Sequence, residues 1–100
     1  MRARAGRALT VLPRLVADDP ASFALGADNA GRVVGVSNNR GVLWTPSSGG
    51  GYTVQALPGL ASGGTGSWAA AINEAGQIVG RATASAKQGG GWHAVLWTLP

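Results

Sequence analysis

Two stretches of the chain repeat each other and decide the fold. Residues 12–35 read LPRLVADDPASFALGADNAGRVVG, and residues 57–80 read LPGLASGGTGSWAAAINEAGQIVG. The second stretch follows the first at an offset of 45 residues without a gap, and nine of the 24 positions are identical. A period of this length is typical of folds that stack copies of one supersecondary unit.

The two copies match again further along the chain. Residues 40–46 read RGVLWTP and residues 93–99 read HAVLWTL, now at an offset of 53 residues. The additional residues of the second copy fall within 81–92, RATASAKQGGGW, between two matched segments. Because insertions are tolerated where the chain runs over the surface, the sequence predicts a Gly-rich surface loop at 81–92.

Each copy divides into about four short antiparallel strands, because runs rich in Val, Ile and aromatic residues alternate with turn residues. The alanines at 69–71 also allow a helix over 68–75. The matching stretch 23–30 contains Gly26 and no such run, and two copies of one unit should share one conformation, which favours a strand. The expected strands are 10–12, 22–27, 32–37 and 42–45 in the first copy, and 52–57, 67–72, 77–82 and 95–98 in the second.

The turn after the second strand of each copy has the same chemistry. Residues 28–31 read DNAG and residues 73–76 read NEAG. The Asx side chain accepts hydrogen bonds from the turn backbone, and Gly adopts a positive φ without a Cβ clash. The structural repeat positions expected from the match of the two copies are Gly31, Gly35, Trp44, Asn73, Gly76, Gly80 and Trp97.

Four strands per 45–53 residues is the period of a β-propeller blade. The predicted fold is therefore all-β, with a basic arm at 1–8, a first blade-like repeat at 9–51 and a second at 52–100. Blades bury their faces against each other, so two blades leave two sheet faces uncovered. We expect self-association or additional blades, either in an oligomeric propeller or in a longer protein of which this chain is a fragment.

Composition excludes several classes of protein. The 100 residues include no Cys, one His, four acidic and eight basic residues, for a formal net charge of +4. The absence of Cys excludes a disulfide scaffold, a thiol nucleophile and a Cys-based metal site. Half of the basic residues are arginines at or before position 14, whereas a nucleic-acid-binding protein spreads them over a face. We expect no nucleic-acid partner.

The start of the chain does not read as a signal peptide or a membrane span. The apolar run Ala8–Leu12 ends at Pro13. It is shorter than the roughly 7–15 apolar residues of a signal peptide and the roughly 18 residues of a transmembrane helix.

A known repeat carries a similar pattern. Residues 71–80 read AINEAGQIVG, and HAVLW follows at 93–97. This order resembles the HAF repeat of probable extracellular bacterial proteins, in which A-x-N-x-x-G-x-V-V-G precedes H-A-F-L-W. Val95 stands in place of the signature Phe, and the first copy departs further, with Asp28 in place of Asn and RGVLW at 40–44. The resemblance implies a repeat architecture and an extracellular location, and it brings no catalytic residues.

Little in the chain points to catalysis. His93 is the only histidine and stands where the first copy has Arg40, which is typical of a polar residue that ties a loop to the start of a strand. Asp18 and Asp19 are adjacent in a loop where the second copy has glycines, as in a solvated turn. We expect no catalytic residue, no metal site and no cofactor.

The aromatic residues are more informative. Trp44 matches Trp97 and Phe23 matches Trp68, and repeated aromatics are expected in the core between blades. Trp92 has no counterpart and lies between a glycine run and His93, so an indole beside a hydrogen-bond donor is available there to stack on a sugar ring. The predicted ligand-binding residues are Trp92 and His93.

The sequence predicts a non-catalytic, extracellular-type repeat module with a structural or protein-interaction role. Two alternatives stay open: a carbohydrate-binding propeller that closes by oligomerisation, and a hydrolase that uses His93. The expected partners are further copies or blades, and a protein or glycan ligand.

Overall fold

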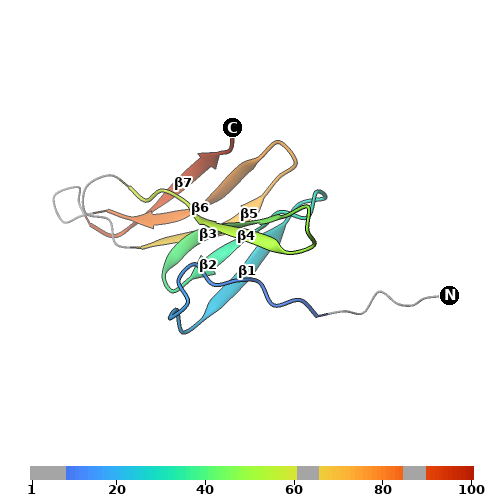
Figure 1. Cartoon of the computed structure of the whole chain (residues 1–100). Coiled ribbons are helices and arrows are strands. Elements are labelled where there is room, and N and C mark those ends of the chain that lie inside the picture. The colour runs from blue at the N-terminus through green and yellow to red at the C-terminus, as the bar shows by residue number, and fades with distance from the viewer. Residues whose placement is uncertain (1–8, 61–65, 85–89) are drawn as a thin grey trace.

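The computed structural model describes residues 9–60, 66–84 and 90–100, and within these residues the chain is all-β, as predicted. The first sheet is antiparallel and contains, in order, β1 (Ser22–Ala27), β2 (Val33–Ser37), β3 (Arg40–Pro46) and β4 (Tyr52–Ala56). The second sheet, also antiparallel, contains β5 (Ser67–Ile72), β6 (Gln77–Thr83) and β7 (Trp92–Thr98). Neither sheet is closed, and the two pack against each other through β5 (Figure 1).

The repeat in the sequence is also a repeat in the structure. β1, β2 and β3 correspond to β5, β6 and β7 at the same two offsets, 45 and 53 residues. The strand predicted at 67–72 is confirmed over the helix alternative. β4 follows the first repeat in the sequence, but it pairs with β3, so that Trp44 lies opposite Val54. The first sheet therefore takes its fourth strand from the residues of the second repeat.

The strand expected at 10–12 is wrong, because these residues form no strand. Residues 10–12 correspond to 55–57, which run along β3: Ala56 lies opposite Val42, and the Leu57 N–H donates to the Gly41 carbonyl at 2.9 Å. Among the described residues, 10–12 have no such strand beside them.

The loop expected at 81–92 is shorter than predicted. β6 continues to Thr83 and β7 begins at Trp92, and these two residues lie opposite each other. The remaining part of the insertion is residues 84–91, of which 85–89 lie outside the described residues.

The predicted turn chemistry is confirmed in both copies. Asp28 Oδ1 accepts hydrogen bonds from the N–H groups of residues 30 and 32 at 3.1 and 2.8 Å. Asn73 Oδ1 accepts from those of residues 75 and 77, both at 3.0 Å. Gly31 and Gly76 have φ of +88° and +83°, the left-handed region that favours glycine.

A second conserved feature of the two copies is a bulge in their first strands. The register shifts between Ala24 and Gly26 in β1, and between residues 69 and 71 in β5. Opposite each bulge lies a glycine that the backbone approaches closely: a Cβ on Gly35 would lie 1.9 Å from the Phe23 carbonyl oxygen, and one on Gly80 would lie 1.9 Å from that of Trp68. These two repeat positions therefore exclude any side chain.

The core lies between the two sheets. The first sheet contributes Val34 and Leu43, and the second contributes Ala69, Ile78 and Trp97. Leu57, in the segment that joins the sheets, completes the cluster. The expectation that Trp97 belongs to the core between repeats is confirmed.

The same expectation is wrong for the other three aromatic residues. Trp68 is half-buried and lies opposite Arg81, on the face of the second sheet that points away from the core. Trp44 is buried, but it follows Leu43 in β3 and so points to the opposite face of the first sheet. There its Nε1 donates to the Pro13 carbonyl at 2.6 Å, just as Trp97 Nε1 donates to the Pro58 carbonyl at 2.7 Å. Phe23 is exposed, because it lies on an edge strand beyond the area that the second sheet covers.

Candidate functional site

Trp92 and His93, the predicted ligand-binding residues, are not brought together by the structure. They are consecutive in β7, with Trp92 opposite Thr83 and His93 opposite Ala82. Because consecutive strand residues point to opposite faces of a sheet, their side chains do not share one site. His93 is exposed, and its Nε2 lies 3.0 Å from the Gly90 carbonyl oxygen in the loop before β7.

A search of the described residues finds no group of three or more His, Asp or Glu side chains placed to hold a metal ion. In those same residues no helix is long and apolar enough to cross a membrane.

One face of the second sheet is exposed and apolar. We call it the outer face and define it by Trp68, Val79, Arg81, Ala94 and Leu96, which are neighbours across β5, β6 and β7. Val79 is 49% and Leu96 56% exposed, although both are large aliphatic side chains in the middle of their strands. Exposed aliphatic residues that lie scattered on a surface are ordinary, but contiguous ones mark interaction sites.

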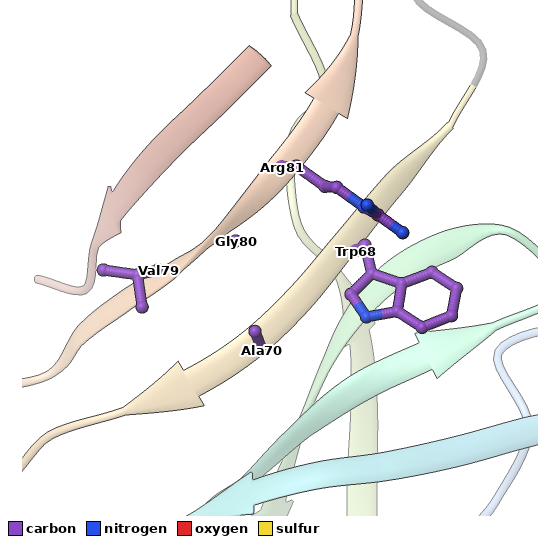
Figure 2. Close-up of a pocket in the computed structure, with 5 residues that line it drawn as sticks. All are labelled: Trp68, Ala70, Val79, Gly80 and Arg81. Carbon is purple, nitrogen blue, oxygen red and sulfur yellow. The ribbon is translucent and has the colours of Figure 1, made fainter. Parts of the chain in front are cut away.

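Arg81 lies between two indoles at one end of the outer face. Its guanidinium carbon lies 5.2 Å from the centre of the Trp68 ring and 4.7 Å from that of Trp92. Figure 2 shows the Arg81 side chain reaching from β6 across to Trp68 on β5. Beside them is an open hollow of ≈ 490 Å³, which Ala70 and Val79 also line. Stacking on two rings fixes the direction of the guanidinium. Each cation–π contact contributes about 0.5–1 kcal/mol at an exposed site.

The outer face has a counterpart in the first sheet, and the second sheet buries that counterpart. Val79 and Leu96 correspond to Val34 and Leu43, which are 0% and 4% exposed. Arg81 corresponds to Val36, which is also buried. The outer face is thus the side of the repeat that, in the first copy, receives another sheet.

The contact between the two sheets shows which side chains and hydrogen bonds join this face of the repeat to a second sheet. Ser67 at the start of β5 accepts a hydrogen bond from the Gly41 N–H on its Oγ at 2.7 Å, and its own N–H donates to the Asn39 carbonyl at 3.0 Å. The backbones approach closely, since a Cβ on Gly26 would lie 3.0 Å from the Ala71 Cα. Small residues therefore surround Val34 and Leu43 at this contact, and Ser67 links the two sheets by its hydrogen bonds.

Asp19 is a structural residue that the sequence reasoning missed, because the expected solvated turn is wrong for this side chain. Asp19 is buried, and its Oδ2 accepts hydrogen bonds from Ser37 Oγ at 2.6 Å and from the Val16 N–H at 3.2 Å. The bond from Ser37 is the main cause that holds the pKa of Asp19 below its ordinary value, against burial, which raises it. Asp18 next to it is exposed.

Asp28, in the turn between β1 and β2, is a second carboxylate with a lowered pKa. Burial raises the pKa of Asp28, but hydrogen bonds and the charge of Arg32, with the N–H of residue 30, hold it below its ordinary value. This pair stabilises the turn and lies away from the outer face.

Comparisons of the chain with protein-family models, with curated proteins and with solved structures gave no match. The resemblance to the HAF repeat stays a prediction. The candidate site therefore rests on the internal repeat and on the exposure of the outer face.

Proposed function

We propose that this chain is a non-catalytic repeat module for protein interaction, and that its outer face binds another β-sheet of the same repeat. The observation that supports this is the contrast in burial between matched side chains. Val34 and Leu43 are covered by a sheet, and Val79 and Leu96, at the same positions of the next copy, are open to solvent. The propeller-like stacking, the non-catalytic role and the extracellular location belong to this proposal.

Binding of a partner to the outer face is favourable because it removes exposed apolar side chains from water. Full burial of a Val or Leu side chain contributes about 1.5–3 kcal/mol relative to exposure. The neighbouring positions, Ala70 and Ala94, are small, so they leave the face flat enough for a sheet at the usual spacing of about 10 Å. A sheet is thus the partner whose shape fits this surface.

A tandem fusion of two full chains tests the proposal. No linker is needed. In the fusion, Pro100 of the first half and residues 1–6 of the second half form the connection that corresponds to residues 47–51 between β3 and β4. Fusion raises the effective concentration of one half for the other to about millimolar. We expect the thermal midpoint of the fusion to exceed that of the single chain by about 5 °C, the shift that about 1 kcal/mol gives a domain of this size.

Leu96→Lys supplies the matched control, because the fusion contains this position twice. In the first half, the substitution places a charge between the two halves and should abolish the gain. In the second half, the same substitution lies on a face that no further half covers and should leave the gain intact. Both proteins are measured at concentrations too low for separate molecules to associate. Under these conditions, equal midpoints for the fusion and the single chain, or equal effects at the two positions, would refute the proposed function.

A carbohydrate-binding role is the second candidate, and it is favoured by the exposure of Trp92, which contacts Arg81, one of the residues that line the open hollow. Arg81 already stacks on one of the indole faces that a sugar ring would need, which is why a protein partner is the preferred proposal. Binding on a glycan array that disappears in Trp92→Ala would favour this alternative.

A further inference from the structure

The second sheet has an open edge as well as an open face. β3 pairs with β2 on one side and with β4 on the other, whereas its counterpart β7 pairs only with β6 among the described residues. The outer face and this edge are adjacent, since Leu96 and Ala94 belong to β7. A partner that repeats the contacts of the first sheet would therefore bring both a sheet and a strand.

The chain itself carries a segment that corresponds to the missing strand. Residues 9–11 match residues 54–56 of β4 at the offset of 45. Within this segment Leu9 is 94% and Val11 is 85% exposed, so two large aliphatic side chains have almost no contacts. In β4 the matching residues pair along β3.

We call the face of the first sheet that points away from the second sheet its far side. This face corresponds to the core face of the second sheet, which is buried. The second sheet and the segment before it contact the first sheet with Ala69, Ile78 and Leu57, all of which are buried. The matching residues of the first copy are less covered: Ala24 is exposed, and Val33 and Leu12 are half-buried. The far side of the first sheet is thus less covered than its counterpart, although Trp44, which matches Trp97, is already buried there.

We propose that the partner is a second copy of this chain, docked head to tail. The first sheet of the second copy covers the outer face of the first copy, and its residues 9–12 pair with β7 as a fourth strand. The register follows from β3 and β4: Val11 lies opposite Val95, Thr10 opposite Leu96, and the Leu12 N–H donates to the Ala94 carbonyl. This inference rests on the proposed function and names its partner.

Charge favours a second copy at this contact. In the internal contact Ser67 lies beside Gly41, which is opposite Val36 in the β2–β3 pair. By the same geometry Ser22 of the second copy lies beside Ala94, which is opposite Arg81. Asp18 precedes Ser22 by four residues and is exposed, so it comes within reach of the exposed Arg81. In the internal contact the matching residues are Gly63 and Val36, and neither is charged.

The arrangement is heterologous, because the two surfaces in contact are different. A heterologous contact repeats from copy to copy and gives a ring if it closes or a filament if it does not. Either product distinguishes it from a twofold dimer, in which one surface meets itself.

Disulfide trapping tests the register directly, because the chain contains no cysteine. Opposite residues of an antiparallel pair have Cα atoms about 4.5–5.5 Å apart, within the range of a disulfide. We expect an equal mixture of Val11→Cys and Val95→Cys chains to oxidise to a cross-linked dimer. A mixture of Val11→Cys and Ala75→Cys chains is the control, since position 75 lies at an exposed turn away from both surfaces.

Complementation between two monomeric variants tests the direction of docking. Leu96→Lys blocks the outer face, and Ala24→Lys blocks the far side of the first sheet; both residues are exposed, so the folded chain should tolerate either change. Ala75→Lys is the matched control and should assemble as the unmodified chain does. We expect each blocked variant alone to scatter light as a monomer and their mixture to give a one-to-one dimer.

Three results would overturn the second copy as partner. The first is trapping no greater than in the control mixture. The second is dimerisation of Ala24→Lys on its own, which would mean that outer faces pair with each other. The third is a monomeric unmodified chain up to its solubility limit. If the tandem fusion is nonetheless stabilised, the proposed function stands and this inference alone fails.

Discussion

One hydrogen bond in each repeat holds the segment before the sheet against a tryptophan of that sheet. The two matched tryptophans donate their indole N–H to the carbonyl of the proline in each Leu-Pro pair, at 2.6 and 2.7 Å. A buried indole N–H without a partner would cost about 1–3 kcal/mol. The sequence shows both the tryptophans and the prolines, and this shared bond explains why they recur together.

Asp19 fastens the same segment of the first repeat, and its contribution depends on pH. Its pKa is lower in the folded chain than its ordinary value of about 3.9, so the unfolded state binds the proton more readily. Its stabilising contribution is therefore complete above about pH 5 and is lost as the pH falls through the folded pKa. We expect the free energy of unfolding, measured by urea titration, to fall with acid less steeply in Asp19→Asn than in the unmodified chain.

Asp18→Asn is the control for this prediction, because it is the neighbouring carboxylate in the same loop and is exposed. Asp28 adds its own acid dependence to every variant, so only the difference between variants reports on Asp19. An identical change of slope in Asp18→Asn and Asp19→Asn would contradict the role given to the hydrogen bond from Ser37.

At the residue scale, the sequence could predict what local chemistry determines. The Asx and Gly residues of the turns bond within their own four or five residues, so Asn73 and Gly76 were predictable. Asp19 bonds to Ser37, eighteen positions away, and no local pattern marks that pair. Phe23 was expected in the core because it matches Trp68, but it lies on the edge strand β1, beyond the area of the first sheet that the second sheet covers.

The repeated bulge is the element that is least tolerant of change. Both glycines opposite the bulges meet a carbonyl oxygen 1.9 Å from where a Cβ would lie, and that oxygen belongs to the backbone. Gly35→Ala and Gly80→Ala must therefore move a strand, and we expect each to lower the free energy of unfolding by about 3 kcal/mol or more. Chemical denaturation followed by tryptophan fluorescence measures the loss.

Gly49→Ala controls for the loss of glycine itself. A Cβ at Gly49 has nothing within 4 Å, so the change should stay within about 0.5 kcal/mol. If Gly80→Ala were as mild as Gly49→Ala, the close approach of β5 and β6 at the bulge would be wrong.

The strands could be predicted more readily than their sheets. Alternating apolar runs and turn residues place most strands within a residue or two of their observed bounds. The assignment of Tyr52–Ala56 to the first sheet could not be derived that way, because the pairing with β3 depends on which strand edge is open nearby. The matching residues 10–12 likewise have β-forming side chains, yet they form no strand.

At the scale of the whole molecule, one cluster joins the two sheets. Val34 and Leu43 from the first sheet meet Ile78 and Trp97 from the second, and Leu57 links them. A three-stranded sheet with an exposed outer face has little other apolar burial of its own. We infer that the second sheet depends on the first for its stability, and that the two unfold as one unit.

Ile78→Ala tests this coupling. The side chain is fully buried in the shared cluster, and removing it should cost about 2–5 kcal/mol. Val79→Ala is the matched control, since the next residue of the same strand points to the outer face and should cost less than about 1 kcal/mol at protein concentrations too low for association. Hydrogen exchange should then speed up alike in β2–β3 and in β6–β7 of Ile78→Ala. Continued protection of the first sheet while the second exchanges freely would mean that the first sheet is stable without the second, and that the two do not unfold as one unit.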